Sequence, residues 1–251
     1  MRKKRAGHPA RQNCYEDTLR AEAYAKLGFT NTYYLAYRDL PEIILAHARG
    51  KRAMDFGCGT GRSTRFLRNL GFDAVGADIS TEMIQKASEM DPPGDYRLLQ
   101  GEDFSLWEDQ TFDLILSAFT FDNIPTMEKK VTIFRGLRRI LGREGRIVNL
   151  VSAPDIYTHE WASFSTKDFP ENQHAKSGDP VKIIVTDHED ARPVEDIVWS
   201  DEDYRTVYRK AGLDLLETRR PLAKEDEPFP WVNETRIAPW VIYVVAPCPG
   251  G

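Results

Sequence analysis

Hydrophobic and polar positions along the middle of the chain follow two alternating patterns. Short runs dominated by apolar residues predict buried strands, and stretches with apolar residues three or four positions apart predict helices. The helices are expected from Thr60 to a stop at Gly71, from Ser80 through Ala87, and over 127–141. The strands are expected at 52–56, 72–78, 96–99, 112–118 and 145–151. Because strand and helix alternate, the sequence predicts an α/β fold with a doubly wound, mostly parallel sheet.

The pattern changes after residue 151. The segment 153–199 carries many aromatic and polar residues, and within it 181–186 and 194–199 alternate as in an inserted antiparallel hairpin. A capping box then opens a helix that closes at Gly212. Two further strands, at 213–219 and 240–246, are expected to form a terminal antiparallel hairpin with a long connection. The expected sheet therefore has seven strands, and 153–199 is a capping insertion.

The N-terminal part is expected to differ from the rest. Residues 1–11 are basic and lack apolar periodicity, which predicts a disordered, solvated tail, with a weak electrostatic tether as the alternative. Residues 12–48 are expected to form a helical cap of two helices broken near Gly28, with a kink or a fresh start at Pro41. Together, residues 12–251 are expected to form a single domain.

Composition narrows the class of protein. The chain has 251 residues and a net charge of -5, which argues against broad binding to nucleic acid or to anionic membranes. Its three cysteines are widely spaced, so they indicate neither a disulfide framework nor a zinc site. No apolar run approaches the roughly 20 residues of a membrane span, and no signal peptide is apparent. The expectation is a cytoplasmic protein, either a monomer or a homodimer.

A glycine-rich turn follows the first strand. Gly57, Gly59 and Gly61 occupy alternate positions, as a tight turn that lets a ligand approach the backbone requires. The third glycine comes one residue earlier than in the dinucleotide fingerprint Gly-x-Gly-x-x-Gly. Asp55 precedes the turn, and its carboxylate would repel a pyrophosphate but hold an ammonium group. A second acid, Asp78, ends the next strand, where a carboxylate accepts ribose hydroxyls or else caps the following helix.

Taken in order, these motifs resemble class I S-adenosylmethionine-dependent methyltransferases over roughly residues 12–247. The resemblance depends on the segment from Asp55 to Gly61, on Asp78, on Asp103 with Phe104, and on the strand and loop over 112–125. It implies a seven-strand Rossmann-like methyltransferase fold with S-adenosylmethionine as the cofactor. One departure is the segment 142–145, which lacks the proline and paired glycines common before the fifth strand of such proteins.

The resemblance also implies which residues contact the cofactor. An acid and its apolar neighbour after the third strand, Asp103 and Phe104, would contact adenine. An acidic surface turn explains the same residues equally well. Tyrosines of the N-terminal cap are expected mainly to pack, with one reaching the cofactor or the substrate. The cofactor-binding residues predicted in this way are Tyr24, Tyr33, Asp55, Gly57, Cys58, Gly59, Gly61, Asp78, Ile79, Met83, Glu102 as a register-shifted alternative, Asp103, Phe104, Ser117 and Phe119.

The implied reaction moves a methyl group from a sulfonium to an O or N atom of a small metabolite. A general base is needed only where the acceptor keeps its proton at neutral pH. The candidates are Asp122 and His159, with His174 as a third, and a structural role is the alternative for each. Asp122 with Asn123 offers too few oxygen ligands for a hard cation, so no metal is expected.

The sequence also indicates which methyl acceptor to expect and which other classes of protein to consider. The loop after the fourth strand lacks the Asn/Asp-Pro-Pro-Tyr/Phe sequence typical of enzymes that methylate exocyclic amines of bases, so the expected partner is a small-molecule acceptor and not nucleic acid. An oxidoreductase using NAD(P) is the less favoured alternative, since its third glycine and a Tyr-x-x-x-Lys pair are missing. A non-catalytic S-adenosylmethionine-binding protein remains the other alternative.

Overall fold

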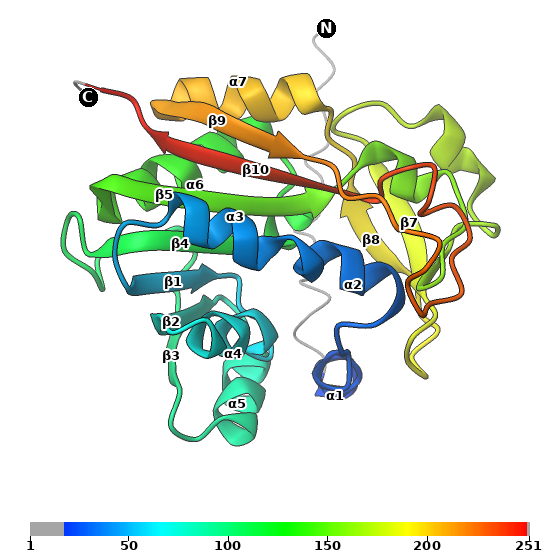
Figure 1. Ribbon diagram of the computed structural model, residues 1–251, viewed down its shortest axis with the longest axis horizontal. Helices are drawn as coiled ribbons and strands as arrows, with labels where there is room; N and C mark the ends of the chain where they lie inside the picture. The colour runs from blue at the N-terminus through cyan, green and yellow to red at the C-terminus, as the bar shows by residue number, and fades with distance from the viewer. Residues whose placement is uncertain (1–17, 250–251) are drawn as a thin grey trace, which may run out of the picture.

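A seven-stranded sheet forms the centre of the molecule in the computed structural model, which describes residues 18–249 (Figure 1). The strand order is β3-β2-β1-β4-β5-β10-β9. Strands β1 to β5 run parallel, and β10 is antiparallel to both of its neighbours. The strands are β1 (Arg52–Phe56), β2 (Asp73–Asp78), β3 (Asp95–Leu98), β4 (Phe112–Ala118), β5 (Leu141–Ser152), β9 (Leu213–Arg219) and β10 (Trp240–Pro247). The predicted doubly wound fold and its terminal hairpin are confirmed.

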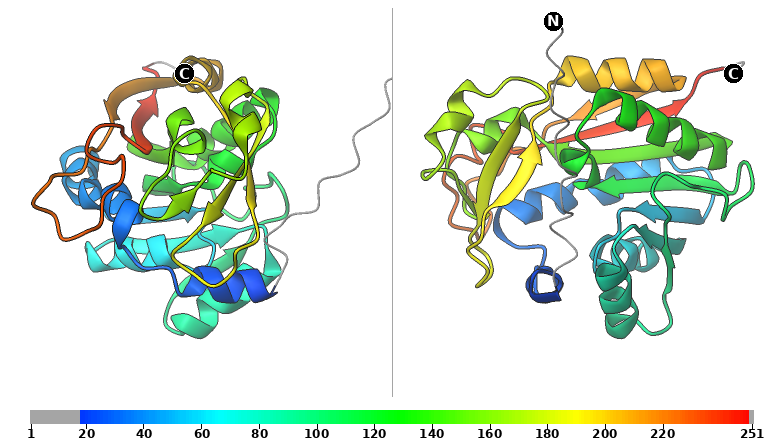
Figure 2. Two further views of the ribbon diagram at one scale, coloured as in Figure 1. Left: turned by 90° about the vertical axis from the view of Figure 1, so that its right-hand side faces the viewer. Right: turned by 180° about the vertical axis from the view of Figure 1, so that it is seen from behind.

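Helices cover both faces of this sheet. Helices α2, α3 and α4 lie on the face that is turned to the viewer in Figure 1, and α6 and α7 cover the opposite face (Figure 2, right). The helices are α1 (Thr18–Ala25), α2 (Asn31–Arg38), α3 (Leu40–His47), α4 (Arg62–Asn69), α5 (Thr81–Met90), α6 (Met127–Ile140) and α7 (Asp201–Ala211). The expected break near Gly28 separates α1 from α2, and Pro41 lies in the first turn of α3.

The hydrophobic core is divided by the sheet into two clusters. Along β4, Leu114 and Leu116 pack into the cluster under α2 to α4, whereas Ile115 packs into the cluster under α6 and α7. All three side chains are fully buried. A strand covered on both faces needs apolar residues at successive positions, which explains why β4 is the most evident strand in the sequence.

A separate three-stranded antiparallel sheet lies beyond the carboxyl ends of β4 and β5 (Figures 1 and 2). It contains β6 (Phe164–Ser165), β7 (Pro180–Val185) and β8 (Val194–Ile197), flanked by the short 3-10 helices η2 (Pro154–Tyr157) and η3 (Pro170–His174). The pairing of β7 with β8 confirms the expected hairpin. Strand β6 was not expected, because two residues carry no periodic pattern and this strand forms only through its pairing with β7.

The connection between β9 and β10 is held to this end of the sheet by a buried acid. Glu234 has no exposed surface and accepts hydrogen bonds of 2.7 Å from the hydroxyl of Thr32 in α2 and from the backbone of Ala162 in the insertion. Three segments far apart in the sequence thus meet at one carboxylate. The N-terminal helices, the insertion and this connection consequently enclose the carboxyl edge of the parallel strands.

The structure can be compared with the predicted boundaries of the fifth strand and of the N-terminal segments. Strand β5 begins at Leu141 and not at residue 145, since Leu141 pairs with Phe112 and a register shift in the β4–β5 pair accommodates the turn over 142–145. The predicted basic tail (1–11) and the first residues of the predicted helical cap (12–17) lie outside the described residues. Within 18–249, no helix is long and apolar enough to cross a membrane.

Candidate functional site

The glycine turn after β1 forms an open cradle. Gly57, Gly59 and Gly61 all adopt positive φ angles, of 73°, 52° and 78°. A Cβ atom on Gly57 would lie 2.0 Å from the hydroxyl oxygen of Thr120, so this position is closed by its own protein. A Cβ atom on Gly59 would meet nothing within 4 Å. The middle of the turn therefore faces empty space, as expected where a ligand approaches the backbone.

Asp55 lies at the base of this turn, with hydrogen bonds to one carboxylate oxygen and none to the other. The side chain is fully buried, and the hydroxyls of Ser63 and Thr64 each donate a 2.7 Å hydrogen bond to its Oδ2. Its Oδ1 has no hydrogen-bond partner. Burial raises the pKa of this carboxyl to about 6. An unsatisfied buried carboxylate oxygen is costly, so this site favours a cationic donor such as an ammonium group.

Asp78 connects the tip of β2 to the glycine turn. Its carboxylate accepts 2.9 Å hydrogen bonds from the backbone N–H groups of Gly59 and Ser80. Burial raises the pKa of this carboxyl, and the backbone donors oppose the shift. The helix cap is supplied by the hydroxyl of Ser80, which accepts from the backbone of Met83. Asp78 is therefore not needed as the cap of α5, and the remaining lone pairs of its oxygens suit ribose hydroxyls.

The other residues predicted to contact the cofactor differ from one another in exposure and in the contacts they make. Ile79 is 54% exposed next to Asp78, so its side chain is accessible to a ligand that this carboxylate binds. Cys58 is buried, and its N–H donates to the carbonyl of Ala77 together with that of Gly57. Glu102 is exposed and forms an ion pair of 3.8 Å with Lys129.

Four of the predicted side chains are placed where contact with a ligand is limited. Asp103 is exposed, and a hydrogen bond from the backbone of Ser105 holds the pKa of its carboxyl below the usual range. The side chains of Met83, Phe104 and Ser117 are buried in the protein. Contact between these residues and the cofactor stays a prediction, which for the three buried residues would involve backbone atoms and for Asp103 its exposed carboxylate.

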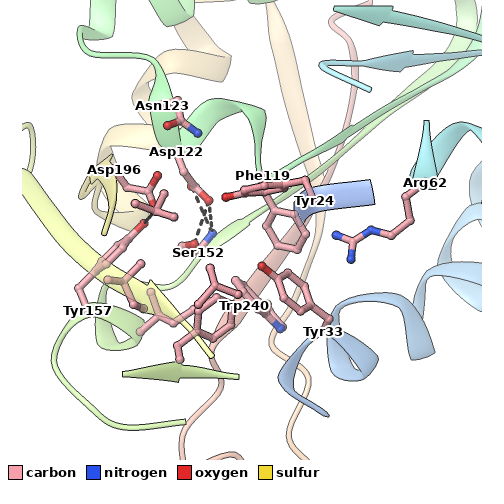
Figure 3. Close-up of a pocket in the computed structure, with 15 residues that line it drawn as sticks. Tyr24, Tyr33, Arg62, Phe119, Asp122, Asn123, Ser152, Tyr157, Asp196 and Trp240 are labelled. Carbon is pink, nitrogen blue, oxygen red and sulfur yellow. Dashed lines mark hydrogen bonds between the residues drawn. The ribbon is translucent and has the colours of Figure 1, made fainter. Parts of the chain in front are cut away.

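A cavity opens at the same edge of the sheet, between the glycine turn and the inserted antiparallel sheet (Figure 3). It is partly open to solvent, and the space between its walls, counted together with that open part, is about 490 Å³. Its lining includes the predicted residues Tyr24, Tyr33, Phe119 and Asp122, and also Arg62, Asn123, Ser152, Ile156, Tyr157, Phe164, Ile183, Val185, Val194, Asp196 and Trp240. Residues from the N-terminal helices, the main sheet and the inserted antiparallel sheet are thus brought together around one space.

Neither predicted histidine lines this cavity. His159 directs Nδ1 to the hydroxyl of Thr158 at 3.0 Å and to the carbonyl of Asp155 at 3.1 Å, both within its own turn. His174 is exposed at the end of η3. A catalytic role for either residue stays a prediction that the geometry of the cavity does not favour, and Asp122 is the candidate base that the cavity contains.

Aromatic rings form one wall of the cavity. The ring centroids of Tyr33 and Phe119 lie 5.9 and 4.8 Å from that of Trp240. The indole N–H of Trp240 donates a 2.8 Å hydrogen bond to the carbonyl of Thr32, which fixes the indole ring. The guanidinium of Arg62 lies 4.8 Å from the centroid of Tyr33, on the side of the glycine turn. This wall is therefore packed and apolar, and among the residues that line the cavity Arg62 places a cation at its end near the turn.

The opposite wall carries two carboxylates. Asp122 accepts hydrogen bonds from the backbone and the hydroxyl of Ser152, the latter at 2.8 Å. Asp196 accepts a 3.0 Å hydrogen bond from the hydroxyl of Tyr157. Burial, and next the negative charge of Asp196, raise the pKa of the Asp122 carboxyl to about 7. A group with this pKa exchanges a proton near neutral pH, as a general base requires.

A buried lysine lies behind Asp122. Lys130 is only 1% exposed, and its ammonium donates to the carbonyl of Phe121. Its Nζ lies 4.9 and 5.3 Å from the ring centroids of Trp199 and Tyr204. Burial lowers the pKa of this ammonium to about 7, against the attraction of Asp122 and Asp196. Lys130 does not line the cavity, so it acts on Asp122 through charge.

Several residues of the site were missed from the sequence. Arg62 directly follows the last glycine of the turn, and that position was the available signal. Asp196 stands next to Glu195 in β8, and Lys130 stands next to Lys129 in α6. Neither buried charge therefore differs in the sequence from its exposed charged neighbour, and no signal in one sequence separates them.

Comparisons with known proteins agree with this geometry. Residues 54–149 match the family model described as "Methyltransferase domain". The chain is 32% identical over 85 residues to the ubiquinone biosynthesis O-methyltransferase of Burkholderia cenocepacia, an alignment covering 32% of this chain and 37% of that protein. It is 31% identical over 93 residues to the cypemycin N-terminal methyltransferase of a Streptomyces species, covering 37% of this chain and 38% of that one. The chain thus aligns with well under half of the length of these relatives.

Similarity to solved structures covers far more of the chain. A crystal structure of an S-adenosylmethionine-dependent methyltransferase from Clostridium acetobutylicum superposes with a TM-score of 0.62 at 15% sequence identity, covering 94% of this chain and 100% of that one. At this identity the similarity establishes the fold. The match over 54–149 and this superposition together confirm the predicted resemblance: the chain has the Rossmann-like fold of S-adenosylmethionine-dependent methyltransferases, and residues 54–149 are similar to the methyltransferase-domain family.

Proposed function

We propose that this protein is an S-adenosylmethionine-dependent methyltransferase that methylates an O or N atom of a small molecule. The observation that carries the proposal is the open cradle at Gly59, flanked by the buried Asp55 oxygen that has no hydrogen-bond partner and by the carboxylate of Asp78. Arg62 directly follows the turn and lines the neighbouring cavity. A cofactor cradle and an acceptor cavity therefore adjoin each other at the carboxyl edge of the sheet, where ligands bind in open α/β folds.

The residues around the cradle fit the parts of S-adenosylmethionine. Asp55 would hold the ammonium group of its methionine moiety, Asp78 would accept its ribose hydroxyls, and Ile79 would cover its adenine ring. When bound, the cofactor supplies a methyl group on a positively charged sulfur, which is already an activated leaving group. The main task of the protein is consequently to align the methyl donor with the acceptor and to exclude water, because the leaving group needs no further activation.

The acceptor cavity supports a small and partly apolar acceptor. Its aromatic wall at Tyr33, Phe119 and Trp240 would hold an apolar body and keep water out. Asp122 would take the proton that the acceptor atom releases, since its pKa is raised to about 7 and its position is fixed by Ser152. The names of the two curated relatives, an O-methyltransferase and an N-terminal methyltransferase, are compatible with either acceptor atom.

Transfer of labelled methyl groups tests this function. The purified protein would be incubated with methyl-labelled S-adenosylmethionine and a panel of small phenols, alcohols and amines. The proposal predicts that label appears in at least one acceptor and that Asp122→Asn lowers this transfer at neutral pH. Binding of the cofactor without transfer to any acceptor would favour the non-catalytic alternative.

A further inference from the structure

Arg62 carries a positive charge at the end of the acceptor cavity that adjoins the glycine turn (Figure 3). It is the first residue of α4 and directly follows the last glycine of the turn. Its guanidinium donates a 2.9 Å hydrogen bond to the carbonyl of Gly28. Within residues 18–249, no carboxylate lies at ion-pair distance from it. The part of the chain that the structure describes thus leaves this half-buried cation without a counter-charge.

Aromatic rings fix the position of this guanidinium. The central carbon of Arg62 lies 4.8, 5.5 and 5.6 Å from the ring centroids of Tyr33, Tyr37 and Phe29. Such rings orient a cation but supply no formal negative charge. A guanidinium carries five N–H donors in one plane, and two of them match the two oxygens of a carboxylate. The surroundings of Arg62 therefore suit a carboxylate from a ligand.

The start of α4 adds to the positive potential at this place. Gly61 is the N-cap of the helix, no side chain accepts a hydrogen bond at this cap, and the first turn contains no acidic residue. A helix N-terminus attracts anions through its free N–H groups and its dipole. Backbone and side chain at the start of α4 therefore both favour a negatively charged group.

The proposed ammonium site at Asp55 adjoins this positive end. Ser63 and Thr64, the next residues of α4, donate 2.7 Å hydrogen bonds to Oδ2 of Asp55. The charge of Arg62 lowers the pKa of the Asp55 carboxyl, against the larger effect of burial. The buried Oδ1 of Asp55 has no hydrogen-bond partner. A site for a cation and a site for an anion thus lie together, as the ammonium and carboxylate groups on one carbon of an α-amino acid require.

We propose that Arg62 binds the carboxylate of the methionine moiety of S-adenosylmethionine, so that Arg62 and Asp55 together recognise an intact amino acid. This role rests on the proposed function, because the ligand of the cradle is the methyl donor only if that function holds. The site consequently selects a nucleoside that carries an amino acid over one that lacks the carboxylate. The hydrogen bond to Gly28 also holds the junction of α1 and α2 beside this group.

Two ligands that differ by one carboxylate test this role by calorimetric titration. They are S-adenosylhomocysteine and its decarboxylated analogue, in which an aminopropyl group replaces the amino acid. The unmodified protein should bind S-adenosylhomocysteine at least about tenfold more tightly than the analogue. Arg62→Gln should reduce this ratio at least about fivefold, since only one ligand offers a carboxylate to the guanidinium. A smaller ratio, or a smaller reduction in a folded Arg62→Gln protein, would overturn the proposal.

The ratio separates carboxylate binding from a purely structural role. Loss of the contact with Gly28 alone would weaken both ligands and leave their ratio unchanged, which would contradict the proposal. Arg62→Lys keeps the charge and should retain more of the ratio than Arg62→Gln does. Arg68→Gln is the matched control, because Arg68 lies on the same helix, pairs with Asp91 and does not line the cavity. This control should leave the ratio unchanged, and thermal melts show whether each variant folds.

A carboxylate on the acceptor has the same chemistry, since Arg62 also lines the cavity. Titration of 3-phenylpropionate into protein saturated with S-adenosylhomocysteine separates the two sources. We expect Arg62→Gln not to weaken binding of this probe. If the variant weakens binding of the probe and leaves the ratio of the nucleosides unchanged, Arg62 serves the acceptor and the proposal is overturned.

Failure of this role is distinguishable from failure of the proposed function. If S-adenosylhomocysteine binds the unmodified protein but the ratio does not depend on Arg62, only the role of Arg62 is wrong. If S-adenosylhomocysteine does not bind the folded, unmodified protein, the proposed function itself is wrong.

Discussion

The backbone N–H of Gly59 donates a 2.9 Å hydrogen bond to the carboxylate of Asp78. The open middle of the glycine turn is thereby fixed by the acid at the tip of the neighbouring strand. In the proposed site, the same carboxylate positions the cradle for the methionine moiety and accepts hydrogen bonds from the ribose. In the proposed site, Asp78 therefore holds the turn that binds the methionine moiety and also contacts the ribose.

Replacement of Asp78 should weaken cofactor binding strongly. Asp78→Ala would remove two hydrogen bonds to ribose at roughly 1.5 kcal/mol each, so the affinity for S-adenosylhomocysteine should fall about 100-fold in a calorimetric titration. Asp73→Asn removes a charge from the exposed first residue of the same strand and should leave the affinity unchanged. An unaltered affinity in a folded Asp78→Ala protein would contradict the assignment of this acid to the ribose.

Alanine should mainly lower stability at Gly57 and mainly lower cofactor affinity at Gly59. Both positions have positive φ, but an added Cβ collides with Thr120 only at Gly57. We expect Gly57→Ala to lower the free energy of unfolding by about 3 kcal/mol, from backbone strain and overlap together, and Gly59→Ala by roughly 1 kcal/mol. Gly59→Ala should nevertheless lose most of its affinity for S-adenosylhomocysteine, because the new methyl group fills the cradle.

Gly71→Ala is the matched control for this pair. Gly71 also has positive φ, at 84°, and follows α4 at the end remote from the cradle, with no atom closer than 3.8 Å to an added Cβ. Its variant should lose stability as Gly59→Ala does and retain full affinity. Denaturant unfolding and calorimetry supply the two readouts. Normal affinity in Gly59→Ala would mean that no ligand approaches the middle of the turn.

Asp122 should make stability depend on pH in the neutral range. Burial and Asp196 raise the pKa of this carboxyl from 3.8 to about 7 in the folded protein, so the folded chain binds its proton more tightly than the unfolded chain. The contribution of Asp122 to stability should therefore fall as pH rises from about 4 to about 7 and stay constant above that. Denaturant unfolding across this range should show the fall in the unmodified protein, relative to Asp122→Asn. Parallel curves for the two proteins would contradict a titration of Asp122 in this range.

Lys130 should set the position of that titration. Its positive charge lowers the pKa of Asp122, so its removal in Lys130→Met should raise this pKa further. The pH range over which stability falls should then extend above pH 7. The exposed Lys129 is the neighbouring control, and Lys129→Met should leave the midpoint in place. A midpoint that is the same in Lys130→Met and in the unmodified protein would show that the two groups are not coupled.

The main sheet and the glycine turn were predictable from the sequence for identifiable reasons. Buried parallel strands such as β4 need apolar residues at successive positions, and the turn needs glycine where φ is positive. Asp55 and Asp78 were predictable because their distance from the turn along the chain fixes their position at the strand ends.

The acceptor side was predictable only in part. The hairpin of β7 and β8 follows from alternation, whereas β6 forms through tertiary pairing of Phe164 with Val185. The acidic end of the cavity joins Asp122 and Asp196, which lie far apart in the sequence and carry no shared motif. Burial by distant segments creates their interaction, and local pattern does not encode it. The chemistry of an imidazole makes His159 a candidate base, but its ring forms hydrogen bonds within its own turn.

Calorimetric titration of the unmodified protein with S-adenosylhomocysteine and, separately, with NADH tests the central claim most directly. The cradle at Gly59 and the acids on either side of it predict saturable binding of one S-adenosylhomocysteine per chain and no binding of NADH. Binding of NADH, or no binding of S-adenosylhomocysteine by the folded protein, would contradict the account.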